Sequence, residues 1–310
     1  MDTSTPDVVE YQRAVEAPAE VVFARLADVA RWPQLLGGVV HAEYLRRAGA
    51  HERIAVWELA GKDEVRAWQA ERTLDAERLL IAFTEQPAWL GGAAVRGEWA
   101  VRPQPDATAV VTLRLRYRAA ERDDAADELA RHSAEWLDAV QRAAERADLD
   151  EVTLDFEDPV FAGGAVPDAW KVLYEADKWP EKLDHVKRLE MTEDVPNIQF
   201  FDMDTLGKDG RTVTTRSVRV CLPQRLIVYK QITPPPLMEA HTGHWRFTPT
   251  PEGMILGARH TCVIRPDRLD VLGAGTTLEG ARRYLRRFLS ANSTTNLRLA
   301  KAFAEERAGA

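Results

Sequence analysis

Hydrophobic and polar residues follow the same succession of patterns twice along the chain. A short segment of alternating character, at residues 8–15 and again at 153–161, is typical of a half-buried strand. A stretch with apolar residues at helical spacing follows, such as Val22, Phe23 and Leu26, and predicts a short helix. Alternating segments separated by turn residues then predict an antiparallel sheet, and a long amphipathic helix closes each half.

The expected elements fall in the same order in both halves. In the first half the strands are expected at residues 8–15, 42–46, 53–59, 64–73, 79–85, 96–103 and 109–118, and the closing helix at 125–146. In the second half the strands are expected at 153–161, 187–192, 197–205, 212–221, 226–232, 241–249 and 254–264. This order forms an α+β plan. A curved antiparallel sheet wrapped around the long C-terminal helix would leave a cavity suited to a small molecule.

An internal repeat accounts for the double pattern. Arg31-Trp32-Pro33 recurs as Lys178-Trp179-Pro180 at an offset of 147 residues, and further matches keep their order along the chain. Matched pairs include Phe23 with Trp170, Arg72 with Arg219, Arg78 with Arg225 and, after one deletion, Trp99 with Trp245. We therefore expect an old duplication that produced two tandem domains, residues 1–149 and 150–310.

Composition narrows the class of protein. The chain of 310 residues carries 41 Lys and Arg against 49 Asp and Glu, and the net charge of −8 argues against nucleic-acid binding. No apolar run approaches the roughly 20 residues of a membrane span, and residues 1–7 lack the features of a secretory signal, so we expect no membrane association. Two cysteines are too few for a disulfide framework, which favours the cytoplasm. Because the chain lacks a Walker loop, a dinucleotide fingerprint and a Gly-x-Ser-x-Gly elbow, we expect a reaction without a cofactor.

Several short motifs keep their order in both halves. In the first half they are Ala17-Pro18, Arg31-Trp32-Pro33, Trp68-Gln69-Ala70-Glu71-Arg72 and Arg96-Gly97-Glu98-Trp99. In the second half they are Lys178-Trp179-Pro180, Ser217-Val218-Arg219, His241-Thr242-Gly243-His244-Trp245 and residues 290–296. In this order the chain resembles the helix-grip superfamily of START-like and birch-allergen-like proteins. With its duplication it most resembles the di-domain aromatase/cyclases of bacterial aromatic polyketide synthesis, over almost its whole length.

The resemblance implies a substrate and partners. The substrate would be a poly-β-ketone carried on an acyl carrier protein, and a ketosynthase and a ketoreductase of the same pathway are possible further partners. The expected reaction is aldol closure of the first ring between carbons 7 and 12, dehydration to the aromatic ring, or both. One departure concerns a tyrosine that single-domain members often carry seven residues after the Trp of Trp-Pro. Val39 and Val186 stand there, so proton transfer by a tyrosine at that point is not expected.

Arg72 and Arg219 are the first candidates for catalysis. Side chains alternate between the two faces of a strand, so Arg72 shares a face with Trp68, and Arg219 shares one with Ser217. Small and polar neighbours suit a cavity wall better than a packed core. An arginine there stays protonated and could stabilise the enolate that forms during aldol closure. The residues alone leave open a surface arginine on an exposed strand face.

The remaining candidates would line the cavities and bind substrate. They are Trp32, Trp68, Trp99, Trp179, Ser217, His241, His244, Trp245, Asn292, Thr295 and Asn296. The last three interrupt an apolar stripe of the closing helix, which indicates a wet or ligand-lined hollow, unless they only bond to the neighbouring backbone. His241 and His244 lie three apart on a strand and therefore point to opposite faces. Since no further ligands complete a zinc site, we expect no metal.

Two loops and one basic edge complete the expectations. Trp89, Gly91 and Gly92 would lie at the mouth of the first cavity, and residues 234–238 at the mouth of the second. Arg282, Arg283, Arg286 and Arg287 recur at helical spacing and could dock an acidic carrier protein, although a solvated helix face explains them equally well. The rival function is a non-catalytic START-like binder or carrier of a hydrophobic small molecule, which needs a cavity but no arginine on its wall.

Overall fold

The computed structural model describes residues 7–85, 94–117, 125–206, 210 and 212–309. The chain divides into two compact units, Met1–Ala147 and Asp148–Ala310. The division lies slightly before the boundary expected from the repeat, because the short helix α4 (Leu149–Val152) already contacts β8 and β14 of the second unit. The loop expected at Trp89, Gly91 and Gly92 lies outside the described residues.

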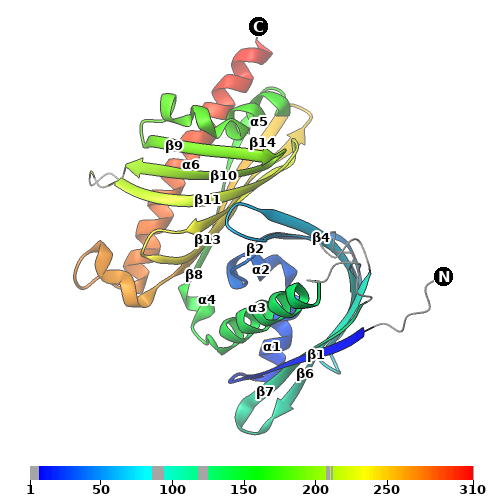
Figure 1. Ribbon diagram of the computed structural model, residues 1–310. Helices are drawn as coiled ribbons and strands as arrows, with labels where there is room; N and C mark the ends of the chain where they lie inside the picture. Colours follow the sequence, from blue (N-terminus) through cyan, green and yellow to red (C-terminus); the bar gives the residue numbers. More distant parts are fainter. Residues whose placement is uncertain (1–6, 86–93, 118–124, 207–209, 211, 310) are drawn as a thin grey trace, which may run out of the picture. The chain divides into compact units, whose positions relative to one another are not determined.

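The first unit is a seven-stranded antiparallel sheet curved around one long helix (Figure 1). The sheet order is β1-β7-β6-β5-β4-β3-β2. The strands are β1 (Asp7–Val15), β2 (Val39–Ala48), β3 (His51–Leu59), β4 (Val65–Asp75), β5 (Leu80–Glu85), β6 (Val95–Gln104) and β7 (Thr108–Tyr117). The helices are α1 (Ala19–Ala27), α2 (Trp32–Leu35) and α3 (Ala125–Glu145), and the 3-10 turns are η1 (Val29–Arg31) and η3 (Pro105–Ala107).

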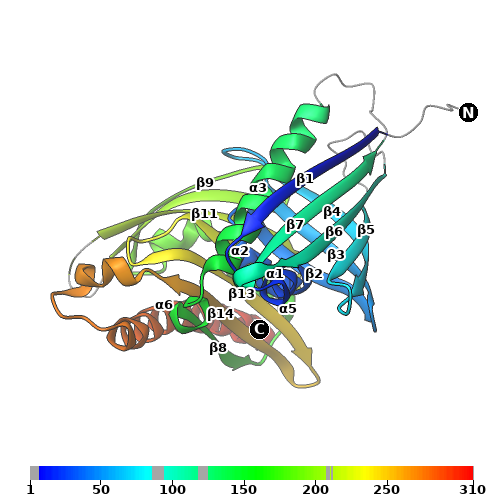
Figure 2. The same ribbon diagram turned by 90° about the horizontal axis from the view of Figure 1, so that it is seen from below.

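The second unit repeats this plan of a sheet and one long helix, α6 (Figure 2). Its sheet order is β8-β14-β13-β12-β11-β10-β9. Its strands are β8 (Thr153–Ala162), β9 (Val186–Val195), β10 (Ile198–Leu206), β11 (Thr212–Leu222), β12 (Leu226–Thr233), β13 (Met238–Thr250) and β14 (Gly253–Ile264). Its helices are α5 (Val166–Tyr174) and α6 (Leu278–Ala308), and its 3-10 segments are η4 (Ala176–Glu181) and η5 (Pro266–Leu272). The α+β class and the helix-grip architecture expected from the sequence are confirmed.

The Trp-Pro pairs lie just beyond the first helix of each unit rather than at its end. Helix α1 ends at Ala27 and α5 at Tyr174, and each Trp-Pro pair sits in the short helical segment that follows. The indole nitrogen of Trp32 donates back to the Arg25 carbonyl, and that of Trp179 to the Val172 carbonyl, each at 3.1 Å. These bonds fold the connecting turn back onto the helix.

Among the helices of the described chain, none combines the length and apolar content that crossing a membrane requires.

Candidate functional site

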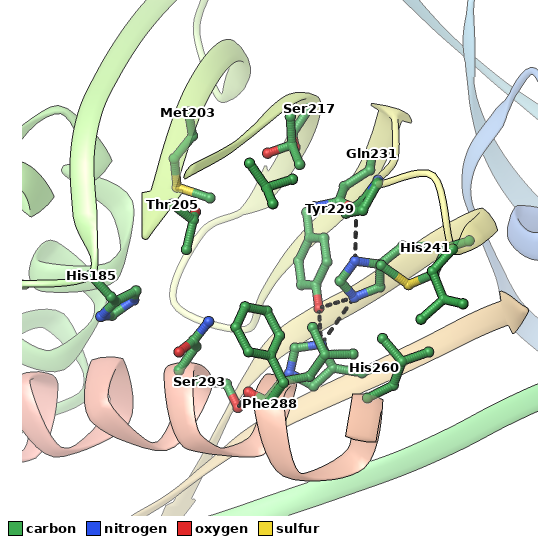
Figure 3. A pocket seen from close by; sticks show the side chains of 18 of the residues that line it. His185, Met203, Thr205, Ser217, Tyr229, Gln231, His241, His260, Phe288 and Ser293 are labelled. Atoms are coloured by element: carbon green, nitrogen blue, oxygen red, sulfur yellow. Dashed lines mark hydrogen bonds between the residues drawn. The ribbon is translucent and has the colours of Figure 1, made fainter. Parts of the chain in front are cut away.

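The second unit contains a cavity of about 350 Å³ between its sheet and helix α6. Figure 3 shows side chains from several strands and from α6 that line this cavity. The predicted residues that line it are Trp179, Ser217, Arg219, His241, Trp245, Asn292 and Asn296. Pro235, Pro236, Leu237 and Met238 also line it, as expected for the loop at its mouth.

The corresponding hollow of the first unit is nearly filled, with a volume of about 50 Å³. Its walls include the predicted residues Trp32, Trp68, Arg72 and Trp99. The ring of Trp136 from helix α3 packs against Trp32 at 5.0 Å and against Trp68 at 6.1 Å between centroids. At the offset of 147 residues, Trp68 stands where the second unit has Thr215. Trp68, in place of a threonine, and Trp136 packed against it therefore occupy space that remains open in the second unit.

Arg219 lies inside the wall of the larger cavity with only 1% of its surface exposed. Its Nη2 donates to the carbonyls of Leu173 at 2.9 Å and Tyr174 at 3.2 Å, the last residues of α5. Cations are favoured at a helix C-terminus, where carbonyl groups lack partners within the helix. The guanidinium carbon lies 5.6 Å from the centroid of the Trp179 ring. Nε and Nη1 are buried without a hydrogen-bond partner among the described residues.

Arg72 is held in the same way but is neutralised by a carboxylate. Its guanidinium donates to the carbonyls of Leu26 at 3.3 Å and Ala27 at 3.1 Å, at the end of α1. It also forms an ion pair at 3.3 Å with Glu52, which is 2% exposed. In the second unit Gln199 faces Arg219 at the cross-strand position that Glu52 occupies opposite Arg72. Arg219 therefore faces an amide across the strand, and that amide in turn donates to Glu193, a carboxylate that interacts electrostatically with Arg219.

A cluster of polar side chains lies on three neighbouring strands of the same cavity (Figure 3). Tyr229 of β12 places its hydroxyl 2.7 Å from Nδ1 of His260 on β14. His241 of β13 lies between them in sequence, and its Nε2 is 3.1 Å from the same Nδ1 and 3.5 Å from the tyrosine hydroxyl. The Nδ1 of His241 is 2.9 Å from Oε1 of Gln231. The hydroxyl of Tyr229 also donates to the carbonyl of Arg259 at 3.2 Å.

Gly243 makes this cluster possible. It is the cross-strand neighbour of both Tyr229 and His260. A Cβ atom at Gly243 would lie 2.3 Å from the tyrosine hydroxyl and 2.1 Å from the carbonyl oxygen of Arg259. Only glycine therefore lets the phenol ring cross β13 and reach the histidine on the next strand.

Burial controls the protonation of the cluster. It lowers the pKa of His241 to about 4 and lowers the pKa of His260 well below its usual value, with a further contribution from the neighbouring His241. Burial also raises the pKa of Tyr229 well above 10. Both imidazoles are therefore neutral near pH 7 and the phenol keeps its proton.

The first unit has the same cross-strand arrangement of backbone positions but lacks the polar side chains of this cluster. Phe83 on β5 faces Gly97 on β6, and Gly97 faces Leu115 on β7, the same row that Tyr229, Gly243 and His260 form. Phenyl and leucine side chains replace the hydroxyl and imidazole. Within the described chain the tyrosine–histidine cluster is thus a feature of the second unit, whereas the polar side chains in the wall of the first hollow are Arg72, Glu85, His132 and Ser133.

Two predicted substrate-binding residues do not line the cavity. His244 is half-buried on the opposite face of β13 and approaches Arg246 at 3.1 Å, because it is an odd number of positions from His241 on one strand. Thr295 is exposed on α6 and its hydroxyl donates to the Ala291 carbonyl at 2.8 Å. Helix rotation instead turns Ser293, which was not predicted, toward the cavity beside Asn292 and Asn296. Expecting His244 and Thr295 in the pocket was wrong.

The basic edge of α6 is largely used within the fold. Arg282 donates to the carbonyls of Glu151 and Thr153 at 2.7 Å, and Arg286 makes two bonds to Asp158 at 2.9 and 2.7 Å. Arg283 forms an ion pair with Glu279 one helical turn away. The helix therefore does not present a row of four free arginines, as the spacing suggested.

Sequence reasoning found His241 but missed Tyr229, Gln231 and His260. The one available signal was Gly243, since a glycine within an expected strand marks a close approach of another group. Which group approaches depends on the pairing of strands, which the local pattern does not contain.

Comparison with known proteins places this geometry in a family. Residues 15–126 match the family model described as "Polyketide cyclase / dehydrase and lipid transport". The granaticin polyketide synthase bifunctional cyclase/dehydratase of Streptomyces violaceoruber is 37% identical over 96% of this chain and 94% of its own length. The actinorhodin polyketide synthase bifunctional cyclase/dehydratase of Streptomyces coelicolor is 35% identical over 96% of both chains.

Solved structures agree with this assignment. The di-domain ARO/CYC StfQ from the steffimycin biosynthetic pathway is 51% identical, with a TM-score of 0.90 over 97% of this chain and all of its own. A second di-domain ARO/CYC, BexL, is 35% identical with a TM-score of 0.85 over 96% of this chain and 99% of its own. The chain therefore belongs to the di-domain aromatase/cyclases, the bifunctional cyclase/dehydratase enzymes of polyketide synthases.

Proposed function

We propose that the cavity of the second unit folds a poly-β-ketone, closes its first ring between carbons 7 and 12 and directs loss of water to the aromatic ring. The observation that carries this proposal is Arg219, a cation that lines the large cavity of the second unit and whose Nε and Nη1 have no hydrogen-bond partner among the described residues. A predominantly apolar cavity with a few convergent polar groups is the usual form of a small-molecule site.

The cavity walls and Arg219 have different roles in the proposed reaction. The walls hold the flexible chain so that one enolisable carbon meets one ketone, which replaces an unfavourable search of conformations by a near-attack geometry. Arg219 donates to the ketone oxygen and stabilises the negative charge that develops on the enolate. Since the helix carbonyls and Trp179 already fix its guanidinium, little reorganisation is needed as the charge forms.

The substrate would arrive bound to an acyl carrier protein, with a ketosynthase and, for a reduced chain, a ketoreductase acting earlier. We infer these partners because the relatives of the chain are named as parts of polyketide synthases. The cytoplasm, expected because two cysteines are too few for a disulfide framework, is the location in which we place the reaction, and both cysteines are unpaired and buried.

The test compares Arg219→Met with Arg72→Met in the full-length protein, using a reconstituted ketosynthase, carrier protein and malonyl building blocks, with products separated by chromatography and mass spectrometry. Loss of one donor to a developing oxyanion typically costs about 100- to 1,000-fold in rate, and we expect a loss of this order for Arg219→Met. Arg72→Met should keep the product pattern and lose only stability. Circular dichroism checks folding, and Arg219→Lys retains the charge without the planar fork if the methionine variant is unstable.

The opposite result, full cyclisation by folded Arg219 variants, would contradict the assignment. It would favour the rival function, a binder of hydrophobic molecules, in which the arginine changes ligand affinity but not the product.

A further inference from the structure

The cluster of Tyr229, His241 and His260 has no part in ring closure as described above, yet all three side chains line the cavity. We propose that Tyr229 is the catalytic acid of the dehydration step, with His260 and His241 as the residues that position and support it. This inference rests on the proposed function of the cavity and adds a second chemical role within it.

Hydrogen-bond logic assigns the protons of the cluster. The amide oxygen of Gln231 only accepts, so Nδ1 of the neutral His241 carries its proton and Nε2 carries a lone pair. The Nδ1 of His260 lies 3.1 Å from that lone pair and must therefore be the protonated nitrogen of its ring. The same N–H faces the oxygen of Tyr229 at 2.7 Å, while the tyrosine proton is directed at the Arg259 carbonyl. Tyr229 is thus a donor whose oxygen already receives a hydrogen bond.

Accessibility selects Tyr229 as the group that meets the substrate. Tyr229 is only half-buried and lines the cavity, whereas His241 and His260 are 4% and 6% exposed. The Nε2 of His260 is buried without a partner among the described residues. All three side chains line the cavity, but Tyr229 is the most exposed of them. An oxygen of a bound ligand can therefore replace the Arg259 carbonyl as the acceptor of its proton.

The proposed step balances without any further reactant. Tyr229 gives its proton to the β-hydroxyl of the cyclised intermediate, the C–O bond breaks, and the hydroxyl leaves as water. The electron pair of the neighbouring C–H bond forms the C=C bond, and the released proton returns to the phenolate oxygen. The N–H of His260 stabilises that phenolate while it exists, because a hydrogen bond to the charged form favours it. The enzyme ends in its starting state.

The first unit provides an internal comparison. It keeps the glycine of the row, Gly97, but carries Phe83 and Leu115 where the second unit has Tyr229 and His260. Gly97 still lies against the Phe83 ring, with 2.0 Å between a hypothetical Cβ and Cζ, so the aromatic crossing is a feature of the scaffold. The hydroxyl and the imidazoles are the features that distinguish the second unit.

Tyr229→Phe in the full-length protein tests the inference, because it copies Phe83 and removes one oxygen. Products are sampled at early times, before spontaneous dehydration, and the ratio of the aromatic product to the cyclised product that is heavier by one water is measured. General acid catalysis typically contributes about 100- to 10,000-fold, so we expect the ratio to fall at least 100-fold while total cyclised product is retained. Tyr11→Phe makes the same chemical change in the first unit and should leave the ratio unchanged.

A wild-type ratio in Tyr229→Phe would overturn the inference, while loss of all cyclised product in Arg219→Met would still support the proposed function. Wild-type products from both Tyr229→Phe and Arg219→Met would contradict both the inference about Tyr229 and the proposed function of the cavity. His260→Leu should lower the ratio as Tyr229→Phe does. His260→Asn should give a higher ratio than His260→Leu, because the amide N–H of Asn can replace Nδ1–H. An equally low ratio in His260→Asn and His260→Leu would contradict the positioning role, because the proposed role depends on the N–H that only the Asn variant keeps.

Discussion

Replacement of Gly243 by alanine probes the row of side chains on which the polar cluster depends. The added Cβ would lie 2.1 Å from the Arg259 carbonyl oxygen and 2.3 and 2.5 Å from the hydroxyl oxygen and Cζ of Tyr229. The carbonyl belongs to β14, which pairs with β13 along most of its length, so it cannot move without loss of strand hydrogen bonds. Overpacking of this kind costs about 1–3 kcal/mol, and the rigid backbone contact puts Gly243→Ala near 3 kcal/mol. For a cooperative unit of roughly 150 residues that lowers the midpoint of thermal unfolding by about 6–12 °C.

The matched variant is Gly97→Ala in the first unit. There the three nearest atoms, at 2.0, 2.5 and 2.6 Å, all belong to the Phe83 ring, which can rotate away. We expect a loss nearer 1 kcal/mol, at the lower end of the same range. Gly37→Ala is the neutral control, since nothing lies within 4 Å of its Cβ position.

Thermal unfolding of the intact chain, with hydrogen exchange read by mass spectrometry, assigns each loss to its unit. Gly243→Ala should also displace Tyr229 from His260 and lower the yield of dehydrated product, which Gly97→Ala should not. If Gly243→Ala unfolded at the same temperature as Gly37→Ala, the close crossing of Tyr229 over β13 would be wrong.

Three further predictions concern titration and cavity size. Burial raises the pKa of Glu85 from 4.5 to about 7. The protonated Glu85 therefore contributes about 3 kcal/mol to the stability of the first unit, which is fully present below pH 4.5 and lost as the pH rises through 7. Glu85→Gln should flatten this pH dependence in denaturant unfolding. Burial lowers the pKa of His241 from 6.5 to about 4, so its contribution is present above pH 6.5 and about 3 kcal/mol is lost as the pH falls through 4, a loss that His241→Gln should remove from acid unfolding curves. Thr215→Trp copies Trp68 of the first unit and should abolish cyclisation with little change in circular dichroism; retained cyclisation would show that the reaction does not use the larger cavity.

The alternation of residue types was sufficient to predict much of the wall of the site. Arg219 and Ser217 were expected on one strand face from spacing alone, and both line the cavity. The helical stripe of α6 was predicted in outline, and Asn292 and Asn296 do face the cavity. The same spacing failed at Thr295, because a stripe read from one sequence does not define its edges to within one residue.

The sequence by itself determined the two units, the order of their elements and which residues share a face, because these depend on periods of 2 and 3.6 residues along a single segment. Only the tertiary structure decided which hollow stays open, since that depends on Trp136 of α3 meeting Trp68 of β4 in the first unit. It also decided that Tyr229 and His260 meet across Gly243. Contacts between strands depend on their register, and a local pattern fixes the phase of each strand but not its alignment with its neighbours.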